Sequence, residues 1–530
     1  MTTTLPSAAY RAISSHRAIS SWGITSGYLH KSRKVKQEQT NIQAMKRKPD
    51  MNFWGLWNLS FGFFGVQIAY ALQSANISRI FSTLGADPHS LSFFWVLPPL
   101  MGIIVQPLVG KYSDRTWCRW GRRIPYLFLG AAVAVAVMCL LPNAGSLHLD
   151  NTTLIWGTMT AVMLFGLLML MLLDTSINMA MQPFKMLVGD MVNEEQKKKA
   201  YSIQSFLCNA GSVVGFIFPF LFTWIGISNT APEGVVPDSV IYSFYIGAAI
   251  LILCVIYTTL KVREWAPAEY NEYNGIEESA SESKENAEEP GMVTLLVKAP
   301  AAFWEIGLVQ FFCWAAFLFM WTYTNGTVAA NAFDTPILNG ELDTKSEAYQ
   351  LAGNWVGILY AVQAVGSVVW ATVIPNIKST KLGYAISLVL GGIGFVSMAY
   401  INDPYLLFVS FILIGCGWAA MLAYPFTLLT NALEGKGHMG TYLGLFNGTI
   451  CLPQIVAAIL GGAILSLMPV AENGASNQPM MMVVAGVFLF IGSAAVFTIK
   501  ERERKERKNR RDQRDQERQN LVVSGCKINT

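Results

Sequence analysis

Long apolar segments separated by short polar loops recur along the 530-residue chain. A helix needs about 20 mostly apolar residues to cross a bilayer, so segments of that length are candidate membrane spans. The pattern predicts an all-α membrane protein with twelve transmembrane helices. The predicted spans lie near residues 53–79, 91–110, 124–142, 154–182, 202–225, 239–260, 303–328, 352–374, 382–400, 405–430, 441–468 and 480–499.

Most charged residues lie outside these spans. Of the 72 charged residues, 39 fall within 1–50, 261–290 and 500–518, which leaves 33 for the other 431 residues. That share is about 8%, whereas an ordinary soluble domain has about 25%. The distribution excludes a cytosolic enzyme, a nucleic-acid-binding protein and a disulfide scaffold. The five histidines and eight cysteines show no metal-ligand spacing, so we expect no metal and no cofactor.

Most loop lysines and arginines lie in alternate loops. The loops after the second, fourth and eighth spans are basic, whereas those at 143–153, 226–238, 401–404 and 469–479 contain no Lys or Arg. Because basic loops remain in the cytoplasm, the basic loops and both termini are predicted to be cytoplasmic. With no organelle signal, we expect a multi-pass protein of a plasma membrane or a bacterial inner membrane.

An acidic segment divides the spans into six and six, and the two groups resemble each other. The Pro-Phe pair at Pro183 lies 242 residues before the equivalent pair at Pro425. Two parallel six-helix pseudo-repeats are similar to the architecture of the major facilitator transporters. The predicted domains are a disordered basic extension at 1–50, six-helix bundles at 51–260 and 301–499, an acidic cytoplasmic linker at 261–300 and a charged cytoplasmic tail at 500–530.

The loop between the second and third spans has the sequence VQPLVGKYSDRTWCRWGRRIPY. One acid among five bases can anchor helix ends and latch the cytoplasmic side in one state. We expect Asp114 to pair with an arginine or a helix N-terminus; the alternative is that the loop is only a topology signal. The loop resembles the facilitator gating motif in its longer form, through Gly110, Asp114, Arg115, Gly121, Arg122 and Arg123.

Three further segments extend the resemblance. The first span contains GVQIAYALQSANISRIFSTLGADPH, the fourth has Asp174 and Asp190 around a Pro-Phe pair, and the eleventh contains GLFNGTICLPQI. Together they resemble the plant sucrose:proton symporters and their animal and bacterial relatives. These proteins belong to the glycoside–pentoside–hexuronide cation symporters in the broad sense.

Asp174 follows six consecutive apolar residues in the fourth span. A charged side chain at the centre of a membrane helix costs at least about 2.5–3.5 kcal/mol, so Asp174 should face the bundle interior. The resemblance implies a proton-coupling carboxylate at this position, and Asn178, one turn later, is predicted to be its hydrogen-bond partner. The alternative is a hydrogen-bonded Asp that only packs helices together.

Lys185 lies eleven residues after Asp174, on the same helix face and about 16 Å away. The family usually has Arg there, and a lysine lacks the planar fork that grips two hydroxyls at once. Lys185 could therefore contact substrate or simply anchor the cytoplasmic end of the helix.

Sugar binding requires several hydrogen-bonding groups and an aromatic face. Embedded amides and aromatic side chains supply both, although each one alone could simply be a helix-packing contact. The family's histidine at the position of His89 is linked to substrate access; the alternative is an exposed loop histidine. The remaining substrate-binding candidates are Gln67, Gln73, Asn178, Lys185, Trp321, Tyr424, Asn447 and Gln454, with Gln363, Trp314 and Trp355 as further members of the set.

The resulting hypothesis is proton-coupled symport of a disaccharide or α-glucoside, sucrose or maltose, by alternating access. Plant relatives carry acids in span seven where Trp321 and Tyr323 stand here, which leaves maltose open beside sucrose. The expected partners are a sugar, a proton and the lipid bilayer, with no nucleic acid and a monomeric transporter. Alternatives are a sodium-coupled glycoside symporter and a non-transporting membrane sugar sensor. An enzyme is not expected, because no nucleophile–His–acid set lies in the spans.

Overall fold

The computed structural model describes residues 48–147, 154–156, 159–232, 234–274, 292–433, 439–471 and 474–499. Most of the predicted N-terminal extension, the centre of the acidic linker and the charged tail lie outside these residues.

The first half of the molecule is a group of long helices, several of which begin at polar N-caps. The side chain of Asn52 accepts a hydrogen bond from the backbone of Gly55, and Thr160 and Asn193 cap two later helices in the same way. The helices of this half are α2 (Phe53–Thr83), α3 (Pro88–Phe94), α4 (Leu97–Arg115), α5 (Ile124–Leu140), the 3₁₀ turn η1 (Leu141–Ser146), α6 (Ala161–Met191), α7 (Glu194–Trp224) and α8 (Asp238–Lys261).

The second half repeats this arrangement after a linker that contains two short helices, α9 (Pro267–Asn274) and α11 (Met292–Val297). Its helices are α12 (Ala301–Ala332), α13 (Glu347–Val373), the 3₁₀ turn η2 (Ile374–Asn376), α14 (Thr380–Met398), α15 (Leu407–Leu433), α16 (Met439–Phe446), α17 (Gly448–Ser466) and α18 (Gln478–Val496). Two antiparallel hairpins lie outside the helices: β1 (Leu154–Trp156) with β2 (Met159–Thr160), and β3 (Ile337–Leu338) with β4 (Glu341–Leu342).

Eleven helical segments of the described chain are long and apolar enough to cross a membrane. The first predicted span, α2, has 31 residues, but polar side chains interrupt its apolar stretches. Its polar residues are buried inside the protein, so they do not face lipid; they include Gln67, Gln73, Asn76 and Arg79. The predicted all-α fold is confirmed, and α2 accounts for the difference between eleven and twelve.

Several predicted span boundaries were wrong. The fourth span was predicted at 154–182, but α6 begins at Ala161 because the residues before it form a hairpin. The eleventh span is broken at Asn447 into α16 and α17. The first span was predicted to stop at residue 79, whereas α2 continues to Thr83. Apolar content alone does not mark these points, because buried polar residues extend one helix and a local break divides another.

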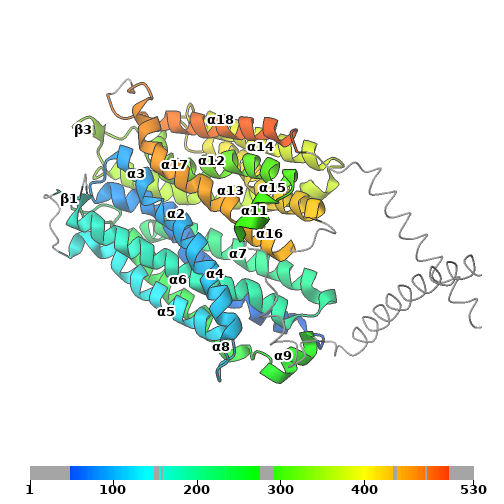
Figure 1. The fold of residues 1–530 in the computed structure, drawn as a ribbon. Coiled ribbons are helices and arrows are strands. Elements are labelled where there is room, and N and C mark those ends of the chain that lie inside the picture. Colours follow the sequence, from blue (N-terminus) through cyan, green and yellow to red (C-terminus); the bar gives the residue numbers. More distant parts are fainter. Residues whose placement is uncertain are drawn as a thin grey trace, which may run out of the picture.

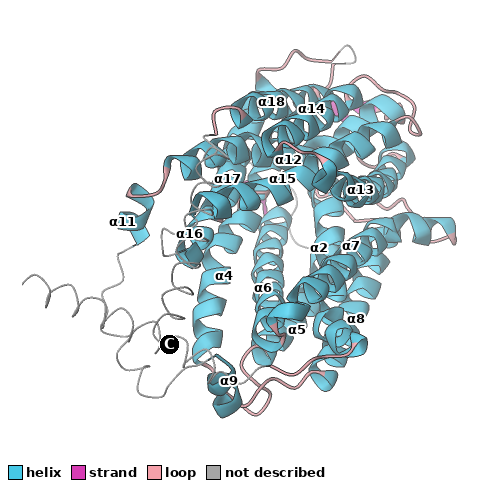
Figure 2. Ribbon diagram, turned by 90° about the vertical axis from the view of Figure 1, so that its right-hand side faces the viewer, coloured by secondary structure: helices cyan, strands magenta, loops and turns pink. Residues whose placement is uncertain are grey.

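The two halves lie side by side, with α5, α6 and α8 in one group and α14, α15 and α18 in the other (Figure 2). The hairpins β1 and β3 lie at one end of the bundle, here called the strand end, and α9 lies at the opposite end, the linker end (Figure 1). Contacts between the halves join α2 and α7 to α13, and α3 and α4 to α17.

Glycines allow the halves to approach closely on both sides of this interface. A Cβ placed on Gly462 of α17 would collide with the carbonyl oxygen of His89, and one on Gly357 of α13 would collide with that of Phe216 on α7. Both obstructing atoms belong to backbone, which cannot swing aside as a flexible side chain can. The closed arrangement of these helices therefore depends on the absence of a side chain at each position.

Replacing Gly462 by Ala is expected to separate the halves at the strand end. Overpacking costs about 1–3 kcal/mol, which shifts an open–closed equilibrium by roughly 5- to 100-fold. The reporter is a cysteine at position 92, because Ser92 is 1% exposed and faces the neighbouring Gly461. A water-soluble maleimide should label that cysteine correspondingly faster in the Gly462→Ala protein. Gly444→Ala, where a Cβ meets no neighbour, is the matched control, and equal labelling of all three proteins would contradict the expectation.

Candidate functional site

A carboxyl–amide pair lies in the interior of the first half. Asp174 on α6 and Gln73 on α2 are each 2% exposed. The Nε2 atom of Gln73 donates a hydrogen bond to Oδ1 of Asp174 at 2.8 Å. Among the described residues, nothing donates to Oδ2 of Asp174 or to Oε1 of Gln73. Two acceptor oxygens thus remain in one buried pair, and buried acceptors without donors are costly.

The predicted partnership between Asn178 and the Asp174 carboxyl was wrong. The Nδ2 atom of Asn178 donates to the backbone carbonyl of Asp174 at 2.9 Å, as short polar side chains often do within a helix. Its Oδ1 atom accepts a hydrogen bond at 2.7 Å from Gln106 of α4. Gln106 was missed at the sequence level, although an amide inside the apolar second span was the available signal. The polar network therefore joins α2, α4 and α6.

Lys185 lies further along α6 toward the linker end and is exposed, although the helix around it is apolar. Its ammonium group lies within electrostatic range of the thiols of Cys208 on α7 and Cys451 on α17. Because Cys451 belongs to the second half, Lys185 lies where the two halves face each other. Asp174 and Lys185 thus lie on the same helix but differ in exposure. The Asp174 side chain is buried, whereas that of Lys185 is exposed.

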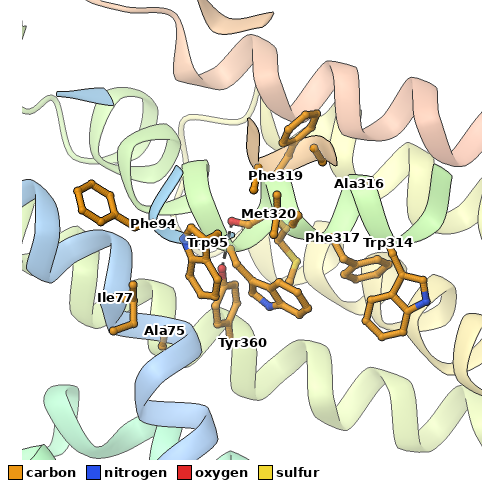
Figure 3. Close-up of a cluster of buried hydrophobic side chains, with 14 of the residues drawn as sticks. Ala75, Ile77, Phe94, Trp95, Trp314, Ala316, Phe317, Phe319, Met320 and Tyr360 are labelled. Carbon is orange, nitrogen blue, oxygen red and sulfur yellow. Dashed lines mark hydrogen bonds between the residues drawn. The ribbon is translucent and has the colours of Figure 1, made fainter. Parts of the chain in front are cut away.

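In the second half, Trp321 contacts the first half directly. Its ring stacks on that of Trp95, the residue between α3 and α4, with centroids 5.9 Å apart. Ser78 of α2 donates to the backbone carbonyl of Trp321 at 2.9 Å and accepts from the indole N–H of Trp95 at 3.0 Å. Figure 3 shows Trp95 within the buried cluster that also contains Ile77 of α2. Trp321 is therefore part of the contact between the halves.

Other predicted binding residues have local partners instead. The ring of Tyr424 packs 5.4 Å from that of Tyr384 on α14. Gln454 donates to the carbonyl of Ile450, four residues earlier on α17, and Gln67 lies at 3.4 Å from the hydroxyl of Ser212 on α7. Asn447 lies at the break between α16 and α17. The structure does not gather these four side chains around Asp174.

Arg79 was not identified from the sequence, because the predicted end of the first span placed it at the membrane edge. It is 1% exposed, inside α2. Its guanidinium donates to Oε1 of Gln350 at 2.8 Å, Oδ1 of Asn354 at 2.8 Å and Oδ1 of Asn229 at 3.0 Å. Gln350 and Asn354 belong to α13, so one buried cation ties the halves together at the strand end. Among the described residues, amide oxygens rather than carboxylates hold it.

His89 also bridges the halves at the strand end. Its Nδ1 atom lies 3.0 Å from the hydroxyl of Ser466 and 3.4 Å from the carbonyl oxygen of Gly462, both on α17. Hydrogen bonds between the halves are thus concentrated at this end, whereas Lys185 is exposed toward the other. The bundle is closed at the strand end and open toward the linker end.

The motif loop forms an ion-pair cluster at the linker end. Arg123 pairs with Asp114 at 2.6 Å, as predicted for that carboxylate, and with Asp190 of α6 at 3.0 Å. Arg122 pairs with Asp190 at 2.6 Å and also lies 3.8 Å from Asp114. The guanidinium of Arg123 in addition donates to the hydroxyl of Ser113. These contacts fix α4, α5 and α6 to one another within the first half.

A segment after α8 completes this cluster. One carboxylate oxygen of Glu264 accepts hydrogen bonds from the backbone N–H groups of Arg123 at 2.7 Å and Ile124 at 2.8 Å, and so caps the N-terminus of α5. Burial raises the pKa of Glu264, and those N–H groups partly offset the effect. Gly121, with φ of +112°, packs against Glu264, so a side chain there would be strained as well as obstructed.

Arg122 is further covered by aromatic rings. Its guanidinium carbon lies 4.1 Å from the ring centre of Tyr270 on α9 and 5.4 Å from that of Trp117. Burial lowers the pKa of Arg122, but the adjacent Asp190 carboxylate outweighs that effect and the pKa is raised. The beginning of the linker is thus attached to the motif loop.

With this geometry established, comparison with known proteins gives a consistent result. A family model described as the Major Facilitator Superfamily matches residues 177–458 and 322–524. The sucrose transport protein SUT1 of Oryza sativa subsp. japonica is 23% identical over 485 residues, which cover 83% of this chain and 87% of that protein. The proton-associated sugar transporter A of Mus musculus is 26% identical over 173 residues, 32% of this chain and 22% of that protein.

Solved structures share the fold. The nucleoside transporter NupG has a TM-score of 0.57 at 14% identity and covers 85% of this chain and 99% of its own. The xylose transporter XylE from E. coli has a TM-score of 0.54 at 12% identity, with 84% and 96% covered. At these identities the similarity concerns the arrangement of helices.

Proposed function

Because the chain belongs to the Major Facilitator Superfamily, we propose that it is a secondary active transporter that carries a sugar together with protons. Symport by alternating access requires a site for the driving ion and a site for the cargo. It also requires two halves that can open toward either side of the membrane in turn. The contacts of the described residues support each requirement.

The buried Asp174–Gln73 pair is the observation that carries proton coupling. An ionised Asp174 would leave Oδ2 without a donor in a site that water does not reach, which is unfavourable. A neutral carboxyl has an O–H that can donate to Oε1 of Gln73 while Oδ1 keeps the hydrogen bond from Nε2. One bound proton would then satisfy both acceptor oxygens. In this conformation, closed at the strand end, Asp174 therefore holds the proton.

The sugar site lies between the halves, beside this pair. The first half contributes hydrogen-bonding groups from Gln106 and Asn178 and the exposed ammonium of Lys185. The second half contributes indole rings, beginning with Trp321. The coverage of a plant sucrose transport protein over most of both chains favours a disaccharide, and sucrose and maltose are the first candidates.

Access alternates between the two ends of the bundle. Among the loops at the strand end, only the one at 333–346 contains a Lys or Arg, Lys345, so that end faces outward, the linker end faces the cytoplasm, and the described conformation is inward-facing. The cluster around Asp114, Arg123 and Asp190 holds the cytoplasmic ends of the first half together as a rigid unit. That unit can then rock against the second half.

Uptake into proteoliposomes tests the proposal. An inwardly directed proton gradient should drive accumulation of radiolabelled sucrose or maltose, and a protonophore should abolish it. A sodium gradient at constant pH should drive none. Failure of every disaccharide in a panel, with folded protein in the vesicles, would rule out sugar symport.

Sodium coupling and signalling are the competing functions, and each predicts a different result. Sodium-driven uptake that survives the protonophore would replace the proton by sodium. A sensor would bind sugar without moving it, so binding with no uptake in either gradient would favour that role.

A further inference from the structure

Four indole rings form a continuous row from the first half into the second. Trp95 stacks on Trp321 at 5.9 Å, Trp321 meets Trp418 of α15 edge-on at 6.1 Å, and Trp418 meets Trp314 of α12 edge-on at 5.7 Å. These four residues are here called the tryptophan row. Figure 3 shows Trp95 near the middle of the buried cluster and Trp314 at one edge of it. Of the four, Trp314 and Trp321 were already candidates from the sequence, whereas Trp95 and Trp418 were not.

The members of the row differ in exposure. Trp95, Trp314 and Trp321 are 4%, 7% and 9% exposed, whereas Trp418 is half-buried. Trp314, Trp321 and Phe317, the last at 5.0 Å, contact the indole of Trp418. Aromatic neighbours therefore hold Trp418 in place while part of its side chain stays accessible.

The accessible part of Trp418 does not face lipid. On the same helix, Gly415 packs against α13 and Gly417 against α14, and Trp418 points between them toward α12. The lipid-facing side of α15 carries Val409 and Ile412, which are 57% and 46% exposed. The accessible part of Trp418 thus lies on the interior side of α15, where the row crosses to the first half.

One of the rings that contact Trp418 carries an unused hydrogen-bond donor. The indole N–H of Trp314 is buried, and no acceptor for it lies within the part of the chain that the structure describes. Buried indole N–H groups usually have a partner. An aromatic face beside an unused donor matches the chemistry of a sugar ring, which presents C–H groups on its face and hydroxyls around its edge.

We propose that Trp418 is the stacking platform for a pyranose ring of the transported sugar and that the indole N–H of Trp314 donates to one of its hydroxyls. Trp418 would serve this role only if the protein transports sugar, as proposed above. The two halves then have different roles. The second half contacts the face of the sugar ring, whereas the first half supplies amides that bind the hydroxyls and the carboxyl that binds the proton. The favoured cargo is a glucoside whose ring has a continuous C–H face.

Binding by the purified full chain in lipid nanodiscs tests this assignment. Sucrose, maltose and methyl α-glucoside are titrated against the wild type, Trp418→Leu, Trp418→Phe and the matched control Trp370→Leu. Trp370 is also a half-buried tryptophan of the second half, but its N–H bonds to Ser387 and its ring lines an apolar groove between α7, α13 and α15. We expect at least tenfold weaker binding in Trp418→Leu, binding within about threefold of wild type in Trp418→Phe, and no change in Trp370→Leu.

Tryptophan fluorescence supplies a second readout that does not depend on the leucine variant folding. Sugar contact with Trp418 should change the emission of the wild type and of Trp370→Phe by equal amounts, and that of Trp418→Phe by clearly less, because only Trp314 still meets the sugar there. Unchanged binding in Trp418→Leu, or a sugar-induced emission change as large in Trp418→Phe as in the wild type, would overturn the platform. Equal loss in the leucine and phenylalanine variants would also overturn it, because a phenyl ring still offers an aromatic face. A wild type that binds none of the sugars would instead overturn the proposed function, and the platform with it.

Discussion

Replacing Asp174 by Asn is expected to abolish uphill sugar uptake driven by a proton gradient, with accumulation falling by about 100-fold or more. Asparagine keeps the size and the hydrogen bond of the neutral acid but cannot release a proton. The energy of the gradient would then be uncoupled from the sugar. A 100-fold fall in the accumulation ratio of the sugar corresponds to a loss of roughly 2.7 kcal/mol of driving free energy. Uptake of radiolabelled sugar into proteoliposomes at an imposed pH gradient measures it.

The same variant should still exchange sugar across the membrane when no net transport is required. Counterflow, in which unlabelled sugar inside draws labelled sugar in, should remain within a few-fold of the wild type, because the amide mimics the protonated state that this conformation favours. Asp238→Asn, at the exposed start of α8, is the control and should leave both assays unchanged. Undiminished proton-driven accumulation in Asp174→Asn would remove Asp174 from the coupling mechanism.

Replacing Arg79 by Met is expected to open the strand end. The guanidinium donates to Gln350, Asn354 and Asn229, and hydrogen bonds to a charged group contribute about 1.5–3 kcal/mol each. Methionine avoids the cost of burying a cation but leaves those amide oxygens without their donor. A net loss of about 3 kcal/mol lowers the ratio of protein closed at the strand end to protein open there by more than 100-fold. Maleimide labelling of a cysteine at position 92 should accelerate accordingly, and uptake should slow because the outward-closed state becomes rare.

Two further variants make the result specific to the guanidinium. Arg79→Lys keeps the charge but not the planar fork, so its labelling rate should lie between those of the wild type and Arg79→Met. Arg263→Met removes an exposed arginine at the linker end and should label as the wild type does. A cysteine that remains equally protected in Arg79→Met would show that other contacts hold the strand end closed.

The helices could be predicted from the sequence because lipid imposes one simple requirement on each of them. A run of about 20 apolar residues is a property of the chain alone, and eleven such helices are present in the described residues. The first span fits this requirement least well, because it contains the polar residues Gln73 and Arg79. Their hydrogen-bond partners lie 100 or more residues away in the sequence. Where a span was misplaced, as at Arg79, the reason was a partner that the local sequence does not contain.

The candidate site shows the same limit. Asp174 could be identified because an acid among apolar residues is rare in any membrane helix. Its partner could not: Asn178 was the nearest amide along the helix, but it bonds to the backbone, and Gln73 reaches the carboxyl from α2. Trp418 gave no local signal, because an indole in an apolar segment is ordinary until its neighbours are known.

The sequence by itself determined that this protein is a bundle of membrane helices in two related groups, with one acid in the interior of the fourth span and a basic motif loop. These features depend on composition and on the spacing of residues, and both can be obtained from the linear sequence. Only the tertiary structure decided that Gln73 faces Asp174, that Arg79 joins α2 to α13, and that part of Trp418 stays accessible. Each of these depends on which helices pack together, and that is set by long-range contacts between segments that the sequence keeps apart.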